Sequence, residues 1–211
     1  MSSKEKIVRK GYDRVAKEYQ ADRRVFDHRE ELETLVSLLA KGARVLDVGC
    51  GAGVPVTSFL VDSGFDVIGV DFSESMLELA RENVPRAEYV KGSMTRLGFK
   101  GNSFDGLTAF YSAIHVPRER HFSLFEDFHR ILRPDGVMLI CMGPDEWEAA
   151  DEYYGAEMFW SHYSPEKSLH LVKDAGFQIV FSRYIRSGGE THYWILAKNL
   201  KRMHGQSGSS A

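Results

Sequence analysis

The sequence predicts an α/β protein built on one seven-stranded sheet, with six parallel strands, one antiparallel strand and helices on both faces. Up to residue 142, short apolar runs rich in β-branched residues alternate with amphipathic helical segments, which is typical of a parallel sheet. A glycine-rich turn follows the first expected strand, at the edge where such sheets bind ligands. Near the end of the chain a short glycine turn joins two expected strands, so the last strand should run antiparallel.

The composition is that of a single globular domain. The chain has 211 residues, 43% of them hydrophobic, which is enough for an adequate core. The formal net charge is −3, from 27 basic and 30 acidic residues, and no extended basic tract indicates a nucleic-acid partner. A small molecule is therefore the expected partner, and the sequence leaves both a monomer and a homodimer open.

Several features together predict a cytoplasmic protein without a membrane segment. No stretch approaches the roughly 20 apolar residues of a membrane span. The first residues lack the apolar core of a signal peptide. Cys50 and Cys141 both fall at the ends of expected buried strands, where we expect reduced thiols.

The chain is organised around residues 44–53, where a buried strand runs into a glycine turn. Residues 45–48 are apolar apart from Asp47, as in a strand buried on both faces. Three glycines follow at alternate positions: Gly49, Gly51 and Gly53. They let a ligand lie against bare backbone, and a helix expected over residues 52–61 aims its free N–H groups at that ligand. Asp71 closes the next strand, where an acid is placed for ribose hydroxyls, so the pattern predicts half of a nucleotide-binding sheet.

The glycine spacing does not fit a dinucleotide-binding loop. That fingerprint requires Gly or Ala three residues after its second glycine. The position holds Val54 in one register and Val56 in the other, so both registers fail. Asp47, inside the strand end before the first glycine, also departs from the dinucleotide pattern.

Four motifs in order resemble those of the class I S-adenosylmethionine-dependent methyltransferases. Residues 45–53 read Val-Leu-Asp-Val-Gly-Cys-Gly-Ala-Gly, and the others are residues 70–76, 103–105 and 132–137. The resemblance is strongest over residues 40–142 and is closest to the small-molecule enzymes of methyltransferase type 11. It implies a Rossmann-like methyltransferase sheet, S-adenosylmethionine as cofactor, and direct displacement of its methyl group by a small-molecule nucleophile.

Two other functions remain open beside that one. The first is a methyltransferase that acts on RNA or protein, and the second is a regulatory domain that binds S-adenosylmethionine without turnover. Methyl transfer of this kind depends mainly on alignment and water exclusion, so the absence of an obvious catalytic dyad does not argue against an enzyme. The sequence gives neither the substrate nor the accepting atom.

The resemblance implies a single methyltransferase domain over residues 1–202, with an N-terminal helical lid over residues 1–40. Val8, Tyr12, Val15 and Tyr19 recur on one helical face. This face is either a packing stripe or, as the family pattern from Tyr12 to Tyr19 implies, part of a cover over the cofactor. Asp27 and Glu30 form an expected capping box for the second helix.

The family motifs also imply a set of cofactor contacts along the carboxyl edge of the sheet. These are Tyr12, Tyr19, Asp47, Gly49, Cys50, Gly51, Asp71, Phe72, Met76, Ser93, Met94 and Phe110. Relatives often carry Asp or Asn at the position of Ser93 to contact the adenine amino group. Here a hydroxyl and the Met94 backbone N–H would meet the adenine edge instead.

The remaining elements follow from local patterns. Ser73 and Ser164 are expected to cap helices, the second with proline at its first position. Further strands are expected over residues 88–91, 104–110, 137–142, 177–185 and 191–197, with 88–91 at a sheet edge and a helix over 119–132. The last strand should lie between the fifth and the sixth. We expect residues 203–211 to form a flexible tail.

Residues 143–163 are predicted to form a helical insertion over the substrate site. The segment mixes many acids with Trp147, Tyr153, Tyr154, Phe159 and Trp160. A charge run is usually a solvated face, but the interleaved aromatics suggest that one side covers something. Such a surface would suit a cationic or apolar substrate, since aromatic faces attract cations.

Three residues are predicted to serve catalysis: Tyr111, His162 and His192. Tyr111 leaves the carboxyl end of the fourth strand, and both histidines should reach the same rim, where imidazole can orient the substrate or accept its proton. In the competing account, Trp160 and Tyr163 only pack the insertion against the rest of the protein, and both histidines form hydrogen bonds with nearby backbone groups. His115 is expected to cap its loop.

The other histidines are expected to face solvent, and no metal is expected. His28, His121, His129, His170 and His204 fall on expected helix surfaces or the tail. The separations between the rim histidines carry no metal-ligand signature.

Overall fold

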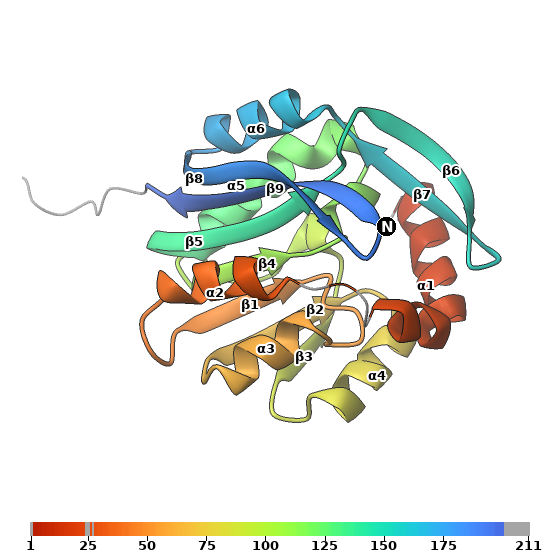
Figure 1. The fold of residues 1–211 in the computed structure, drawn as a ribbon, viewed down its shortest axis with the longest axis horizontal. Coiled ribbons are helices and arrows are strands. Elements are labelled where there is room, and N and C mark those ends of the chain that lie inside the picture. Colours follow the sequence, from red (N-terminus) through yellow and green to blue (C-terminus); the bar gives the residue numbers. More distant parts are fainter. Residues whose placement is uncertain (1, 24–25, 27, 201–211) are drawn as a thin grey trace, which may run out of the picture.

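The computed structural model describes residues 2–23, 26 and 28–200. Seven strands form one sheet in the order β3-β2-β1-β4-β5-β9-β8 (Figure 1). Their bounds are β1 Arg44–Val48, β2 Asp66–Asp71, β3 Glu88–Lys91, β4 Phe104–Ala109, β5 Leu132–Met142, β8 Phe177–Ser187 and β9 Glu190–Asn199. Neighbouring strands from β1 to β5 pair parallel, whereas β9 pairs antiparallel with both β5 and β8. The predicted fold class, the edge position of β3 and the place of the last strand are confirmed.

Six α-helices accompany the sheet in the described residues. They are α1 Ser3–Arg23, α2 Arg29–Ser37, α3 Val56–Asp62, α4 Glu74–Asn83, α5 His121–Ile131 and α6 Pro165–Asp174. Short 3-10 turns span Met94–Arg96, Ala113–His115 and Arg118–Arg120. The Ser73 side chain accepts a hydrogen bond from Met76 N and the Ser164 side chain from Lys167 N, which confirms both predicted caps. The predicted cap Asp27 lies outside the described residues.

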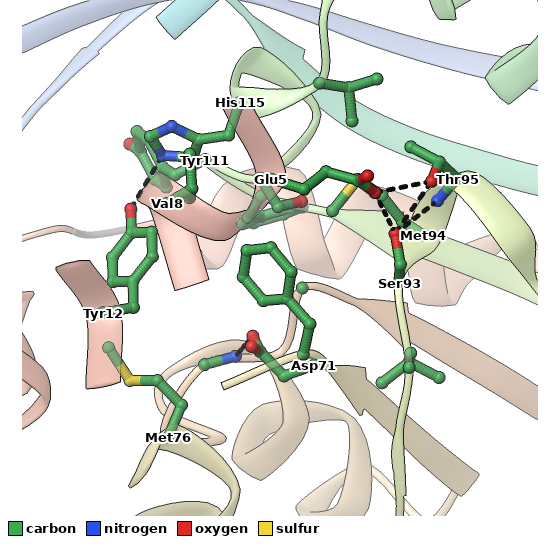
Figure 2. A pocket seen from close by; sticks show the side chains of 18 of the residues that line it. Glu5, Val8, Tyr12, Asp71, Met76, Ser93, Met94, Thr95, Tyr111 and His115 are labelled. Atoms are coloured by element: carbon green, nitrogen blue, oxygen red, sulfur yellow. Dashed lines mark hydrogen bonds between the residues drawn. The ribbon is translucent and has the colours of Figure 1, made fainter. Parts of the chain in front are cut away.

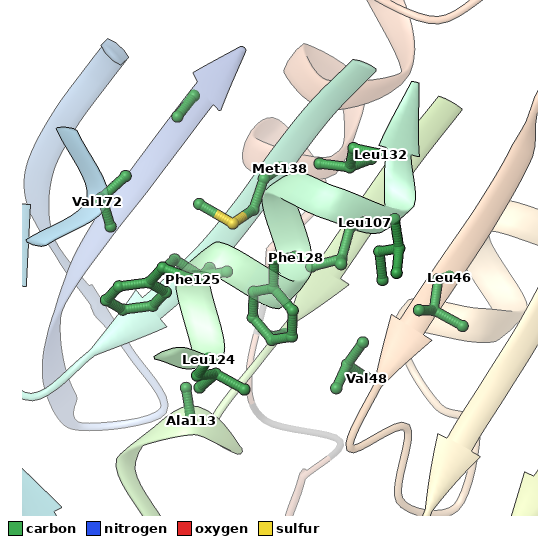
Figure 3. Packing of buried hydrophobic residues seen from close by; sticks show 14 of the residues in the cluster. Leu46, Val48, Leu107, Ala113, Leu124, Phe125, Phe128, Leu132, Met138 and Val172 are labelled. Carbon is green, nitrogen blue, oxygen red and sulfur yellow. The ribbon is translucent and has the colours of Figure 1, made fainter. Parts of the chain in front are cut away.

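The core consists of two apolar layers, one on each face of the sheet. On one face, Phe125 and Phe128 of α5 and Val172 of α6 pack on Leu46, Leu107 and their neighbours (Figure 3). On the other, Leu35 of α2 and Leu60 of α3 pack on the opposite side chains of the same strands. Because both faces are covered, the strands read as continuous apolar runs. The carboxyl edge of the sheet therefore remains available for ligand binding.

The helix after the glycine turn begins later than predicted. It starts at Val56 rather than Ala52, because residues 49–55 are needed for the turn itself. Gly49, Gly51 and Gly53 all have positive φ angles, between 54° and 78°, which interrupt a right-handed helix.

The prediction of a helical insertion over residues 143–163 was wrong. The segment forms a β-hairpin, β6 Trp147–Tyr153 and β7 Ala156–His162, which pairs antiparallel. Tyr154 and Gly155 make the two-residue turn with φ angles of 52° and 73°, the geometry that suits the twist of a hairpin. The hairpin lies beside α1, with Met158 and Phe159 of β7 packed on that helix (Figure 1).

Two histidines that the sequence predicts at the surface are buried. His28 bonds the Tyr111 hydroxyl at 2.8 Å and lies 4.7 Å from the Trp194 ring centre. His121 is fully buried and its Nε2 donates to Val116 O at 2.9 Å. Their burial comes from long-range packing, which helical position alone does not report. His170 is exposed and His129 half-buried, whereas His204 and the predicted tail lie outside the described residues.

Both cysteines are buried free thiols, as predicted. Across the described ranges 2–23, 26 and 28–200, every helix is too short or too polar to span a bilayer.

Candidate active site

Three adjoining pockets lie at the carboxyl edge of the sheet, and Tyr111 lines all of them. The first pocket lies between the glycine turn, the end of β2, residues 92–95 and α1. The second lies under Tyr19 and Arg23, with Asp47 and Cys50 in its wall. The third lies between the hairpin β6–β7, α1 and the start of β9.

Backbone hydrogen bonds fix the glycine turn against β2. The N–H groups of Gly49 and Cys50 both donate to Val70 O, at 2.7 and 3.1 Å. Gly51 N donates to one carboxylate oxygen of Asp71 at 3.0 Å, and Ser73 N donates to the other at 2.9 Å. Burial raises the pKa of Asp71 to about 6. Asp71 thus holds the turn in place and also lines the first pocket.

The glycines of the turn differ in what a side chain would meet. At Gly49 an added Cβ would lie 2.3 Å from Ser112 Cβ, so this glycine is required by packing. At Gly51 the nearest described atom would be Met76 Sδ at 4.0 Å, because Gly51 faces the open first and second pockets. Gly51 therefore leaves room for a ligand.

Asp47 lies beneath the turn. Its two carboxylate oxygens accept hydrogen bonds from Thr57 at 2.6 Å and Thr108 at 2.8 Å, and burial raises its pKa to about 6. Asp47 and Cys50 line the second pocket only, so neither predicted contact reaches the first.

The first pocket is enclosed by α1 and holds about 630 Å³ of space, including adjoining solvent. Figure 2 shows Tyr12, Asp71, Met76, Ser93 and Met94 around it. Ten of the predicted cofactor residues line this pocket: Tyr12, Tyr19, Gly49, Gly51, Asp71, Phe72, Met76, Ser93, Met94 and Phe110. The structure therefore brings together residues that lie up to about half the chain apart.

His115 joins α1 to the hairpin. Its Nδ1 donates to Phe159 O at 2.7 Å, so its Nε2 is the acceptor for the Tyr12 hydroxyl at 2.8 Å. Burial lowers the pKa of His115 to about 4, which keeps the ring neutral in this arrangement. The ring thus fixes the closed position of α1 in addition to its place in a short turn.

Arg23, a residue missed from the sequence, lines the second and third pockets. Its guanidinium stacks over Tyr111 at 4.3 Å, and its Nη1 lies 3.7 Å from Glu190. Buried Nη1 has no hydrogen-bond partner among the described residues. Nη1 thus lies within ion-pair distance of Glu190 without a hydrogen bond, so it can donate one to an anionic group of a ligand.

The third pocket collects the predicted catalytic residues Tyr111, His162 and His192. His162 Nδ1 donates to Asp145 O at 2.7 Å, which leaves Nε2 as the acceptor nitrogen. His192 Nδ1 is buried without a hydrogen-bond partner in the described part of the chain, and burial lowers its pKa to about 4. The Tyr111 hydroxyl bonds His28, so Tyr111 offers its ring rather than its hydroxyl to the pocket.

Aromatic side chains from the hairpin form the outer wall of the third pocket. Trp147 stacks on Trp160 with ring centres 5.6 Å apart and planes 19° apart, and Tyr153 stands edge-on to Trp160. The described residues hold no cluster of three or more His, Cys, Asp or Glu side chains suited to a metal ion.

Glu5 is the second residue missed from the sequence, and it lines the first pocket. A signal was present for both missed residues, because Glu5 and Arg23 continue the helical face of Tyr12 and Tyr19 at spacings of three and four. Both side chains are charged, so they lie outside the apolar stripe that the periodicity of the helix marks.

A methyltransferase domain model matches residues 45–136. An uncharacterized methyltransferase of Synechocystis is 34% identical over 170 residues, which cover 77% of this chain and 78% of that protein. A sterol 24-C-methyltransferase of Gibberella zeae is 32% identical over 76% of this chain. That alignment covers 46% of the sterol enzyme, so the chain spans about half the length of this relative.

A solved structure shares the fold. Burkholderia thailandensis 1,6-didemethyltoxoflavin-N1-methyltransferase, with bound 1,6-didemethyltoxoflavin and S-adenosylhomocysteine, superposes with a TM-score of 0.67 at 22% identity. The match covers 82% of this chain and 78% of that one. Together with the relative that is 34% identical, these findings show that the chain belongs to the class I S-adenosylmethionine-dependent methyltransferases.

Proposed function

We propose that this protein transfers a methyl group from S-adenosylmethionine to a small-molecule acceptor. The first and second pockets would hold the methyl donor, and the third would hold the acceptor. The observation that carries this proposal is a shared wall, because Tyr12, Tyr111 and His115 line both the first and the third pocket. A reacting centre beside Tyr111 would be open to both molecules.

The residues present fit the donor along its whole length. Asp71, which lines the first pocket, would accept hydrogen bonds from the ribose hydroxyls, and Gly51 leaves open space where the donor would pass between the pockets. The Nη1 of Arg23, which makes no hydrogen bond among the described residues, would bond the carboxylate of the methionine part. The predicted contacts Asp47 and Cys50 would support donor binding by shaping the glycine turn and the second pocket.

When bound, S-adenosylmethionine supplies a methyl group on a sulfonium centre that a nucleophile can take by direct displacement. The chain's own contribution is alignment and exclusion of water, which is worth on the order of 7–11 kcal/mol in favourable cases. The helix α1 and strand β7 pack on each other through Val8, Val15 and Met158, so they close the site from one side. The Tyr12–His115 hydrogen bond holds this cover against the sheet.

His162 is the residue we assign to the acceptor's proton. Its Nδ1–H is fixed on Asp145 O, so Nε2 is available as a base. His192 stays neutral at pH 7, because its pKa is lowered to about 4, and its role would be to orient the acceptor by hydrogen bonding. Tyr111 would contribute a ring surface between donor and acceptor.

The acceptor would be a small apolar, planar or cationic molecule. Trp147, Tyr153 and Trp160 offer ring faces and edges, which favour stacking and cation–π contacts. Two of the similar proteins carry names of small-molecule enzymes, one for a sterol and one for 1,6-didemethyltoxoflavin. A reducing compartment such as the cytoplasm is proposed with this function, supported by the free thiols of Cys50 and Cys141.

The test is a methyl-transfer screen. The wild-type protein is incubated with S-adenosylmethionine labelled in its methyl group and a fractionated metabolite extract, and labelled products are identified by mass spectrometry. We expect one small-molecule product class from the wild type, and less of it from the Gly51→Ala variant when S-adenosylmethionine is kept below saturation. Label found only in RNA or protein fractions added in parallel, or no transfer despite tight donor binding, would contradict the proposal.

A further inference from the structure

Gly143 is the first residue after β5, and it lines the third pocket. It is buried, and its φ angle lies outside the left-handed region, so the backbone conformation does not call for glycine. Where the backbone does not require glycine, alanine stabilises a protein because it restricts the unfolded chain. The reason for a glycine at position 143 therefore lies in what a side chain there would meet.

The imidazole ring of His162 occupies the place of that side chain. A Cβ on Gly143 would overlap three ring atoms of His162: Nδ1, Cε1 and Cγ. Cγ is bonded directly to the histidine Cβ, so it moves only when χ1 or the backbone changes. His162 is the last residue of β7 and is 3% exposed. The hairpin thus brings this ring against the bare Cα at the end of β5.

One hydrogen bond decides which ring nitrogen of His162 is the acceptor. Nδ1 donates to Asp145 O at 2.7 Å, so the neutral ring carries its proton on Nδ1 and accepts through Nε2. Asp145 lies two residues after Gly143, so the ring contact and the hydrogen bond involve the same short stretch of chain. A ring displaced from Gly143 would leave Asp145 O as well.

We infer that Gly143 is a positioning residue for the methyl transfer, because its bare Cα lets His162 lie against the end of β5 with Nδ1–H on Asp145 O and Nε2 as the base. This role rests on the proposed function, in which Nε2 of His162 accepts the proton of the methyl acceptor. A side chain at position 143 would deprive the ring of both its fixed tautomer and its direction. A misplacement of about 1 Å can cost roughly 100-fold in rate.

The first experiment reads the tautomer of His162 without any acceptor. Protein with ¹⁵N-labelled histidines is measured by two-bond ¹H–¹⁵N correlation at about pH 8, where an ordinary imidazole is neutral. The His162 signals are those lost in His162→Gln. We expect the Nδ1–H tautomer in the wild type and its replacement by the Nε2–H form or a mixture in Gly143→Ala. An unchanged Nδ1–H tautomer in Gly143→Ala would overturn the inference.

Gly98→Ala is the matched control. Gly98 also has a φ angle outside the left-handed region, and an added Cβ would meet no described atom within 4 Å. It is exposed and does not line any of the three pockets. We expect the wild-type tautomer of His162 in this variant. A changed tautomer in Gly98→Ala would show that the spectra do not report on the Gly143 contact, and would overturn the assignment.

Thermal unfolding gives a second measurement, which also applies if Gly143→Ala is unstable. Overpacking should lower the Tm of Gly143→Ala by several degrees. In a His162→Ala background the same substitution should leave Tm unchanged or raise it, because the ring that the Cβ would meet is gone. Equal falls in both backgrounds would show that the Cβ meets something else, which would overturn the inference.

Kinetics with the acceptor found in the methyl-transfer screen separate positioning from a general structural role. Gly143→Ala should lower kcat about as much as His162→Gln, roughly 100-fold or more, at unchanged affinity for S-adenosylhomocysteine. The double variant Gly143→Ala/His162→Gln should be no slower than His162→Gln alone. Additive losses, or wild-type kcat in Gly143→Ala beside a slow His162→Gln, would overturn the inference and leave the proposed function intact. A wild type that transfers no methyl group would overturn both.

Discussion

Replacing Gly51 by alanine tests the position of the cofactor with a single methyl group. The added Cβ would lie 4.0 Å from its nearest described neighbour, Met76 Sδ, so the ligand-free protein has room for it. The φ angle of 54° is left-handed, which costs alanine about 1–2 kcal/mol. For a chain of this size that corresponds to a fall in Tm of roughly 2–4 °C per kcal/mol. The variant should therefore fold.

Binding should respond much more strongly than stability. The Cβ would project into space shared by the first and second pockets, where the cofactor would lie against the backbone. Overpacking by one methyl group costs about 1–3 kcal/mol, so the affinity for S-adenosylhomocysteine should fall roughly five- to 150-fold. Calorimetric titration measures this directly, with thermal unfolding of the same sample for stability.

Gly42→Ala is the matched control. Gly42 also has a left-handed φ, 72°, and an added Cβ would meet no described atom within 4 Å, but it does not line any of the three pockets. We expect a similar loss of stability and wild-type affinity. Wild-type affinity in Gly51→Ala would refute the placement of the ligand over the turn. Equal losses of affinity in both variants would show that only backbone strain was measured.

Further predictions concern three residues: Asp71, Arg23 and His162. The affinity for S-adenosylhomocysteine should be constant at neutral pH and fall as the pH drops through about 6. Burial raises the pKa of Asp71 to about 6, and protonation below that pH removes its charge. An unchanged affinity at about pH 5 would contradict this. Asp71→Asn should flatten this profile, with any residual slope due to Asp47, whose pKa is also about 6. Arg23→Gln should lower the affinity for S-adenosylhomocysteine about tenfold or more and leave the affinity for 5′-methylthioadenosine, which lacks the carboxylate, unchanged. Equal losses of affinity for both ligands would show that Arg23 does not bind the carboxylate. With the acceptor identified, His162→Gln should lower kcat roughly 100-fold or more at unchanged cofactor affinity, and an unchanged kcat would remove the assigned base.

The strands and the glycine turn could be predicted because their signals are local. The apolar run ending at Val48, the glycines after it and the cap at Ser73 each depend on neighbours within a few residues. The antiparallel last strand followed from the same kind of signal, since Gly188 and Gly189 form its two-residue turn. Local chemistry was sufficient for these elements.

The hairpin β6–β7 was misread because its local propensity opposes its structure. Residues 147–153 read Trp-Glu-Ala-Ala-Asp-Glu-Tyr, in which Ala and Glu favour a helix. Pairing with β7, whose buried face packs on α1, overrides that preference. Gly155, directly after Tyr153 and Tyr154, was the available hairpin signal.

Site residues at long range were the hardest to predict. Glu5 contacts Ser93 across 88 residues of sequence, and His28 contacts Tyr111 across 83. No spacing rule reports such contacts, because they depend on how α1 and α2 dock on the finished sheet. Residues on the strand ends, such as Asp71, needed only the topology of the sheet.

The most direct test of the account is the structure of the protein in complex with S-adenosylhomocysteine. We predict the ribose hydroxyls on Asp71, the carboxylate on Arg23, and the sulfur atom beside Tyr111 with an open path to His162 in the third pocket. A ligand bound away from the glycine turn, or a sulfur atom sealed from the third pocket by Tyr12 and His115, would contradict it.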